Sequence, residues 1–218
     1  MAAIVRTFEE AGQRLVLRDL GTHHELLLGQ VPILSSAALA TERAFGELCR
    51  DFVGAETNRV LIGGLGFGAT VAGALAVTGA DAEVIVVEKL ATVIELLRGD
   101  LAALAPGVLD DPRVRLVQDD VADVIARERA LDAILLDVDN GPGWASFRTN
   151  ARLYAPDGLR RAREALRPGG ALAVWSGYPA EPFTGHLRRA GFTPSVVPLK
   201  ERGVVRARAY VGRVATER

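Results

Sequence analysis

Short apolar runs alternate with amphipathic helical patterns from residue 58 onward. Five of these runs consist mainly of Val, Ile, Leu and Ala and are too short for helices, which is typical of strands buried on both faces. They lie at 60–63, 84–87, 114–117, 133–136 and 171–175. The patterns between and after them predict helices near 70–77, 90–103, 121–128, 157–167 and 181–190. Strands that alternate with helices are joined by right-handed crossovers, so we expect a parallel sheet.

The two ends of the chain carry shorter apolar pieces. Near the start, alternation of apolar and polar residues predicts short strands at 14–19, 25–28 and 30–34. A helix is expected from Ser35 to about Phe52, because its apolar residues form one stripe. Near the other end, two apolar segments flank a polar loop and predict an antiparallel hairpin at the sheet edge, at 194–199 and 207–214.

These elements together predict an α/β protein with a Rossmann-like, mostly parallel seven-stranded sheet that ends in an antiparallel hairpin. A small N-terminal β-hairpin and a helix precede this sheet. We expect two parts, a small strand and helix region at 1–55 and a nucleoside-cofactor-binding domain at 56–218.

Composition narrows the function classes. The chain has 218 residues and a net charge of −1, which gives no bulk attraction to nucleic acid or to an anionic membrane. Cys49 is the only cysteine, so a disulfide within the chain and a thiolate metal cluster are excluded, and no metal site is expected. We see neither a signal peptide nor an apolar run of the ~20 residues that span a bilayer, so we expect a cytoplasmic protein.

The first strand of the predicted sheet runs directly into a glycine-rich loop. This loop contains Gly63, Gly64, Gly66 and Gly68, and a helical pattern begins close behind it. Glycines at this point let the backbone approach a ligand closely, and the first N–H groups of the helix face the loop. With Ala69, the stretch also fits the looser dinucleotide pattern G-x-G-x-x-G/A. Alternatively, the loop is a plain tight turn.

An acid follows the next strand. Glu88 lies twenty residues beyond Gly68, at the expected carboxyl edge of the strand beside the glycine loop. A carboxylate there can accept both hydrogen bonds of a ribose diol. The alternative is an acid that stabilises a helix N-terminus. The combination of strand, glycine loop, helix, strand and acid predicts a nucleoside-bearing cofactor.

Further polar side chains follow the third and fourth strands, and all are expected at the same sheet edge. Asp119 and Asp120 are either pocket residues or caps of the next helix. Asp137 ends a buried strand, where a carboxylate costs free energy unless it meets a partner or a ligand. Asp139 lies in a turn-prone stretch, so a binding role and a turn role are equally compatible with it. Several carboxylates at one mouth favour a cationic ligand, such as a sulfonium or a protonated amine, over a pyrophosphate.

These residues resemble the spermidine synthase (polyamine aminopropyltransferase) family of the class I S-adenosylmethionine-dependent methyltransferase superfamily. The glycine loop at 63–68, Glu88, Asp119 with Asp120, and the stretch at 137–142 are similar to four motifs of that family. The last of these resembles the family's Asp-x-x-Asp-Pro loop. The chain departs from the family at Gly66, where the family loop has an aspartate, and at Asn140, where it has the second acid.

The resemblance implies a transferase that binds S-adenosylmethionine or its decarboxylated form and moves an aminopropyl or methyl group to a small cationic amine. It implies that Asp137 orients the amine and takes its proton, with Asp139 as a helper. Glu88 would hold the ribose, Asp120 the adenine amino group, and the glycines would admit the cofactor. A homodimer is compatible with this resemblance, and no membrane or nucleic-acid partner is expected.

Three alternatives stay open. A small-molecule methyltransferase needs the same cofactor wall but no dedicated acidic amine site. A homologue that binds a nucleoside without turnover is compatible with the missing acids at Gly66 and Asn140. An NAD-dependent reductase fits the glycine pattern, but the chain shows no Tyr-x-x-x-Lys or similar set for hydride transfer.

Overall fold

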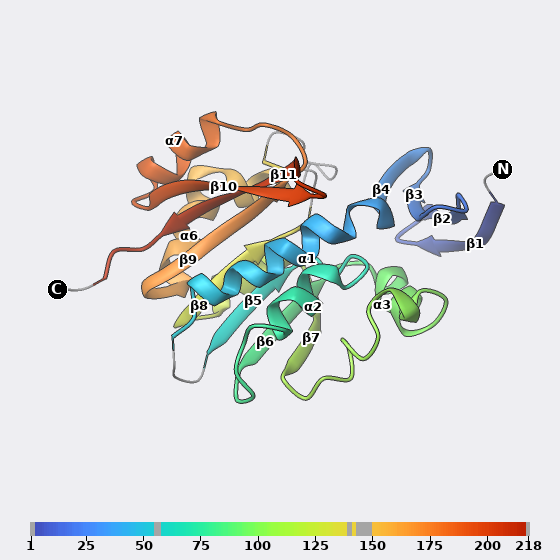
Figure 1. Cartoon of the computed structure of the whole chain (residues 1–218), viewed down its shortest axis with the longest axis horizontal. Coiled ribbons are helices and arrows are strands. Elements are labelled where there is room, and N and C mark those ends of the chain that lie inside the picture. The colour runs from blue at the N-terminus through green and yellow to red at the C-terminus, as the bar shows by residue number, and fades with distance from the viewer. Residues whose placement is uncertain (1–2, 55–57, 139–140, 143–149, 217–218) are drawn as a thin grey trace.

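A seven-stranded sheet forms the centre of the molecule in the computed structural model, which describes residues 3–54, 58–138, 141–142 and 150–216 (Figure 1). The strand order is β10-β11-β9-β8-β5-β6-β7. Its strands are β5 (Arg59–Gly63), β6 (Glu83–Glu88), β7 (Val114–Gln118), β8 (Leu131–Leu136), β9 (Leu166–Ser176), β10 (Thr193–Glu201) and β11 (Val204–Arg213). The pairs from β9 to β7 are parallel, and β11 pairs antiparallel with β9 and β10. This confirms the predicted mostly parallel sheet with its C-terminal hairpin.

The strand order reverses between β5 and β8. From β5 the chain proceeds outward to β6 and β7, and it then returns to pair β8 with the other side of β5. Ligands of open α/β sheets bind beyond the carboxyl ends of the strands at such a reversal. The glycine loop after β5 and Asp137 after β8 are therefore side by side at this point.

Helices cover both faces of the sheet because successive strand side chains point to opposite faces. On β5, Val60 and Ile62 join the core beneath one helical layer, and Leu61 joins the core beneath the other. The first layer holds α1 (Leu39–Glu47), α2 (Ala69–Leu75) and α3 (Ala91–Arg98). The second holds α4 (Val121–Arg127), α6 (Pro156–Ala165) and α7 (Pro182–Arg189), with the one-turn α5 (Ala151–Tyr154) before α6.

The N-terminal region forms a second, antiparallel sheet, which contains the predicted hairpin and one strand more than the three that were expected. Its strands are β1 (Ala3–Glu10), β2 (Gln13–Asp19), β3 (His24–Leu28) and β4 (Val31–Ser35), in that order. Leu15, Leu17 and Leu26 turn toward the core of the first helical layer. β1 was not predicted, because its residues are mostly exposed and show no clear alternation.

This small sheet lies at one end of the molecule beside α3 (Figure 1). Arg6 forms ion pairs with Glu95 and Asp100, at 2.5 and 3.1 Å. The Glu10 carboxylate accepts hydrogen bonds from the backbone N–H groups of Ala91 and Thr92, at 2.7 and 3.0 Å. The sheet is thereby fastened to the start of the helix that borders the site.

Two predicted helices have different limits in the structure. The helix expected at 90–103 ends at Arg98, and a short 3₁₀ turn, η3 (Ala102–Leu104), follows it. The N-terminal helix is divided into η1 (Ser36–Ala38), α1 and η2 (Leu48–Asp51). The boundary between 55 and 56 stays a prediction, since it falls among residues outside the described ranges. In the parts of the chain that the structure describes, no helix is long and apolar enough to cross a membrane.

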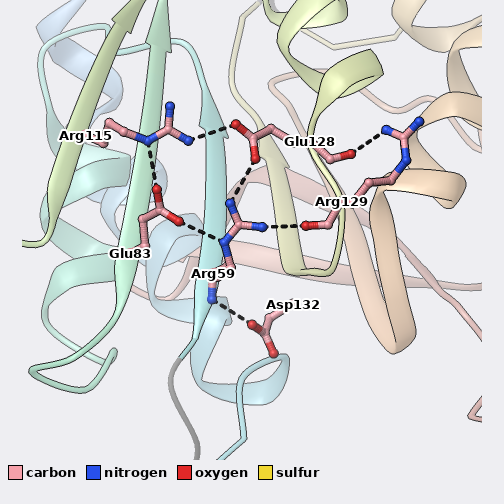
Figure 2. A network of polar contacts seen from close by, with 6 residues as sticks. All are labelled: Arg59, Glu83, Arg115, Glu128, Arg129 and Asp132. Atoms are coloured by element: carbon pink, nitrogen blue, oxygen red, sulfur yellow. Dashed lines mark hydrogen bonds and ion pairs between the residues drawn. The ribbon is translucent and has the colours of Figure 1, made fainter.

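At the amino ends of the strands, four charged residues from separate elements form a ring of ion pairs (Figure 2). Arg59 contacts Glu83 and Glu128 at 2.8 and 2.9 Å, and Arg115 contacts the same two carboxylates at 2.8 Å each. The backbone N–H of Arg59 also donates to Asp132 at 2.7 Å. The ring links β5, β6, β7 and the end of α4 at the sheet edge opposite the site.

Candidate cofactor and acceptor site

A pocket of about 630 Å³, including its open mouth, lies at the carboxyl ends of the central strands. Its wall is formed by the loops after β5, β6, β7 and β8 and by the end of β4. The lining residues are Ile33, Leu34, Gly64, Gly66, Val87, Glu88, Lys89, Leu90, Val93, Asp119, Asp120, Val121, Asp137, Val138 and Asn150. Six of the predicted site residues are therefore brought together, namely Gly64, Gly66, Glu88, Asp119, Asp120 and Asp137.

The four glycines of the loop have different tasks. Gly64 has a φ of +92°, and a Cβ there would lie 2.2 Å from the Asp137 carbonyl oxygen. Gly66 faces open space, because the nearest atom to a Cβ would be a methyl group of Leu34 at 3.8 Å. Gly63 and Gly68 do not line the pocket, and they allow close packing against Val121 and Ala105, at 2.7 and 2.6 Å. Only half of the predicted glycine set therefore lies at the pocket surface.

Glu88 is buried, with 8% of its surface exposed, and both carboxylate oxygens accept backbone hydrogen bonds. Oε2 accepts from the N–H of Leu65 at 3.0 Å, and Oε1 accepts from the N–H of Leu90 at 2.8 Å. Burial raises the pKa of Glu88 above its usual value, and the N–H groups of Leu90 and Leu65 offset part of that rise. The backbone N–H groups of Lys89 and Gly66 also act on this carboxylate, and Glu88 thus holds the glycine loop in place.

Asp120 combines the two roles that the sequence left open. Its carboxylate caps α4 by accepting from the N–H of Ala122 at 3.0 Å, and it also lines the pocket. Arg152 and Lys89 form ion pairs with it at 2.7 and 3.2 Å. Burial would raise the pKa of Asp120, but the bonds from Arg152 and Ala122 outweigh it and hold the pKa below its usual range.

Asp119 is also neutralised by a neighbour, since Arg127 forms an ion pair with it at 2.8 Å and lowers its pKa. With Lys89 and Arg152, three cations accompany the two aspartates that follow β7. The expectation of a uniformly acidic mouth is therefore corrected on this side of the pocket. The sequence pattern located the acids but not their cationic partners, which come from other elements.

Asp137 lies in a different environment on the other side of the glycine loop. Its backbone N–H donates to the Gly63 carbonyl oxygen at 2.8 Å, and its Oδ2 accepts from the Thr70 hydroxyl at 2.5 Å. Burial raises the pKa of Asp137 to about 6, and the Thr70 hydrogen bond acts in the opposite direction. On α1, burial and the nearby Asp137 carboxylate raise the pKa of Glu42 well above its usual value.

Asp137 and Glu42 are a pair of carboxyl groups close enough for the Asp137 charge to raise the pKa of Glu42, and of the two Asp137 lines the pocket. In the described ranges, neither has an Arg, Lys or His within ion-pair distance. Sequence reasoning identified Asp137 but missed Glu42 and Thr70, because only the crossing of α1 and α2 brings them beside the end of β8. Asp139 and Asn140 lie outside the residues that the structure describes.

The fold and the pocket define a class of protein. A seven-stranded sheet with an antiparallel C-terminal hairpin, a glycine loop after its first central strand and an acid after the next are the features of the class I methyltransferase fold. Within that class, the preceding four-stranded sheet is an addition that supplies Ile33 and Leu34 to the pocket.

Comparison with known proteins points to one branch of this class. Polyamine aminopropyltransferase 2 of Pseudomonas aeruginosa is 33% identical to the chain over 124 residues, which are 55% of this chain and 33% of that protein. The chain thus matches only about a third of that relative's length. No family model matches the chain.

Solved structures align with nearly the whole of this chain. A spermidine synthase in complex with the transition-state analogue AdoDATO aligns with a TM-score of 0.73 at 18% identity, over 98% of this chain and 73% of that one. The spermidine synthase of Thermotoga maritima aligns with a TM-score of 0.73 at 19% identity, over 96% of this chain and 72% of that one. The chain therefore has the spermidine synthase fold, including the small N-terminal sheet.

Proposed function

We propose that the protein is an aminopropyltransferase-type enzyme that takes decarboxylated S-adenosylmethionine and a small cationic amine. The observation that carries this proposal is the Asp137 carboxylate, which lines a nucleoside-type pocket, accepts a hydrogen bond from Thr70 and has no cation partner among the described residues. The carboxyl group of Glu42 lies close enough to be affected by its charge. Two carboxyl groups with raised pKa values can share a proton and hold a protonated amine. The similarity to polyamine aminopropyltransferase 2 supports the same activity.

The pocket suits the adenosyl part of such a sulfonium. Its wall combines the apolar side chains of Ile33, Leu34 and Val87 with a few polar groups, as is usual for small-molecule sites. In our proposal, Glu88 accepts the ribose hydroxyl hydrogens, Asp120 lies toward the adenine amino group, and the backbone at Gly64 and Gly66 borders the sulfonium chain. Lys89 and Arg152 form ion pairs with Asp120 and hold its carboxylate in place. Adenine binding there requires that one carboxylate lone pair stays accessible to the adenine amino group.

In the reaction, the acceptor nitrogen attacks the carbon next to the sulfonium sulfur. A C–N bond forms, the C–S bond breaks, and its electron pair stays on sulfur to give a neutral thioether. Asp137 takes the proton that the nitrogen loses, and a pKa near 6 suits a general base that works near neutral pH. We further propose Asp139 as a helper in orienting the amine.

Product analysis tests this proposal. The purified protein is incubated with decarboxylated S-adenosylmethionine and putrescine or spermidine, and methylthioadenosine is the expected nucleoside product. Asp137→Asn should bind the sulfonium with unchanged affinity and lose turnover, because it cannot accept the proton. An active Asp137→Asn variant would contradict the role of Asp137 as the base.

Methyl transfer from S-adenosylmethionine is the second candidate, and Gly66 is the observation that favours it. The open space at Gly66 leaves room for a larger sulfonium substituent where the similar family has an acid. The same incubation with S-adenosylmethionine would then give S-adenosylhomocysteine. Binding of either sulfonium with neither product would indicate a nucleoside-binding homologue.

A further inference from the structure

Thr70 lies between the proposed base and the helix that carries Glu42. Its side chain is buried, with 2% of the residue surface exposed. Its hydroxyl oxygen is 2.5 Å from Asp137 Oδ2 and 3.2 Å from the backbone carbonyl oxygen of Glu42. A threonine hydroxyl has one hydrogen to donate, and the shorter distance assigns it to Asp137.

A close helix crossing puts the hydroxyl in this place. Gly46 of α1 and Gly73 of α2 face the partner helix, where a Cβ would lie 2.0 Å from the Thr70 carbonyl oxygen and 2.1 Å from the Arg43 carbonyl oxygen. Any side chain at either position would separate the helices. The two glycines therefore allow Thr70 to contact α1 and the end of β8 at the same time.

Among the described residues, the other carboxylate oxygen of Asp137, Oδ1, has no side-chain donor. The Asp137 backbone is fixed by its hydrogen bond to Gly63, and the Thr70 hydroxyl is the only side-chain donor recorded for its carboxylate within the described ranges. Oδ1 is left for a ligand in the pocket that Asp137 lines.

We propose that Thr70 is a positioning residue that holds Asp137 by Oδ2 so that Oδ1 receives the proton of the acceptor amine. The proposal rests on the proposed function of the site. When the proton arrives on Oδ1, Oδ2 becomes the carbonyl oxygen of a neutral acid and still accepts from Thr70. The carboxyl group therefore keeps one orientation before and after proton transfer.

Three variants separate this role from packing. Thr70→Val keeps the shape and removes the hydroxyl, and Thr70→Ser restores it. Thr78→Val is the matched control, because the Thr78 hydroxyl donates to the Ala74 carbonyl oxygen at 3.0 Å and accepts from Arg113 at 3.4 Å, and neither partner belongs to the pocket. Thr70→Ala replaces Thr70→Val if the valine variant does not fold, as judged by circular dichroism.

The first measurement is the titration of the Asp137 carboxyl carbon by NMR, assigned with Asp137→Asn. The charged groups around Asp137 are Glu42 from α1 and, along the pocket, Glu88, Lys89, Asp119 and Asp120. All of these charged groups are unchanged in the Thr70 variants. Repeating the NMR titrations in a Glu42→Gln background removes the effect of Glu42 ionisation on the Asp137 titration. Thr70→Val removes a hydrogen-bond donor that favours the ionised Asp137 carboxylate, so the midpoint of the Asp137 titration should rise by about one pH unit. Thr70→Ser should return the midpoint to its wild-type value.

The second measurement is turnover with decarboxylated S-adenosylmethionine and putrescine. We expect kcat to fall roughly 10- to 100-fold in Thr70→Val with unchanged calorimetric affinity for the sulfonium, and the acid limb of the pH profile to move upward. An Asp137 titration that is the same in wild type and Thr70→Val overturns the proposal. A shifted titration in a protein without any turnover supports the role of Thr70 and refutes the proposed function, so the two failures are distinguishable.

Discussion

At the scale of single residues, Glu88 and Asp137 show how one functional group serves two tasks. Both are carboxylates at the carboxyl ends of β6 and β8, the strands on either side of β5, and burial raises the pKa of both. Glu88 is surrounded by backbone N–H donors, which favour the charged form and suit a fixed acceptor for ribose hydroxyls. Asp137 has one hydroxyl donor and a second carboxyl group nearby, which suits a group that gains and loses a proton.

Replacing Glu88 should weaken binding of the sulfonium substrate. Glu88→Gln removes the charge from the proposed ribose contacts and half of the acceptors for Leu65 and Leu90, and we expect a loss of roughly 1.5–3 kcal/mol of binding free energy. Calorimetry with S-adenosylmethionine and its decarboxylated form measures this loss. Glu164→Gln, an exposed exchange on α6, is the control, and equal affinities for both variants would contradict the ribose assignment.

The ionised Asp137 carboxylate should lower the free energy of unfolding above pH 6. Its pKa is raised in the folded state to about 6, from an ordinary value of 3.8, so the folded protein binds more protons than the unfolded chain between these values. Stability from this group is present at low pH and is lost as the pH rises through that window. Asp137→Asn should therefore be more stable than wild type in urea unfolding at pH 8, by about 1–2 kcal/mol, and this advantage should disappear toward pH 4. An advantage that does not vary with pH, or that also appears in the exposed Asp81→Asn control, would refute this account.

At the scale of elements, the N-terminal sheet contributes to the site through the start of α3. Leu90 and Val93 line the pocket, and the Glu10 carboxylate accepts from the first two N–H groups of α3. These N–H groups have no partner within their own helix, so a carboxylate from another element supplies the cap. On the side of the pocket formed by Asp137, the close crossing of α1 and α2 at Gly46 and Gly73 sets the position of Thr70.

Removal of the cap should loosen α3 and the sheet together. Glu10→Ala should lower the free energy of unfolding by about 0.5–2 kcal/mol, because two N–H groups lose their acceptor. Urea unfolding measures this effect. Glu9→Ala is the matched control, because the adjacent Glu9 is exposed. A similar loss in both variants would show that the effect comes from β1 in general rather than from the cap.

At the scale of the whole molecule, the sequence predicted those parts of the fold that follow from the local pattern of apolar and polar residues. All five parallel strands and the C-terminal hairpin overlap the apolar runs that predicted them, although β9 begins at Leu166, inside the helix that was expected at 157–167. The convergence of Gly64, Glu88, Asp120 and Asp137 therefore followed from the rule for open sheets. β1 has too little buried surface to leave a pattern. Glu42, Thr70 and the cations near Asp120 depend on contacts between elements far apart in the chain, and no local pattern encodes those.

The ion-pair ring at the amino ends of the strands is far from the pocket, so it should affect stability without affecting binding. Burial would raise the pKa values of Glu83 and Glu128, but the bonds from Arg59 and Arg115 outweigh it, and both values lie below the usual range. The stability that these carboxylates supply is therefore present above their unfolded pKa and is lost as the pH falls through the lowered folded values.

Arg59→Met removes two ion pairs and leaves both glutamates with Arg115 alone. We expect a loss of about 1–3 kcal/mol at pH 7 and low salt, a smaller loss in 1 M NaCl, and unchanged calorimetric affinity for the sulfonium. Arg160→Met breaks exposed pairs on α6 and should cost less than about 1 kcal/mol, as surface ion pairs do. A loss of sulfonium binding in Arg59→Met would show that the two edges of the sheet are coupled.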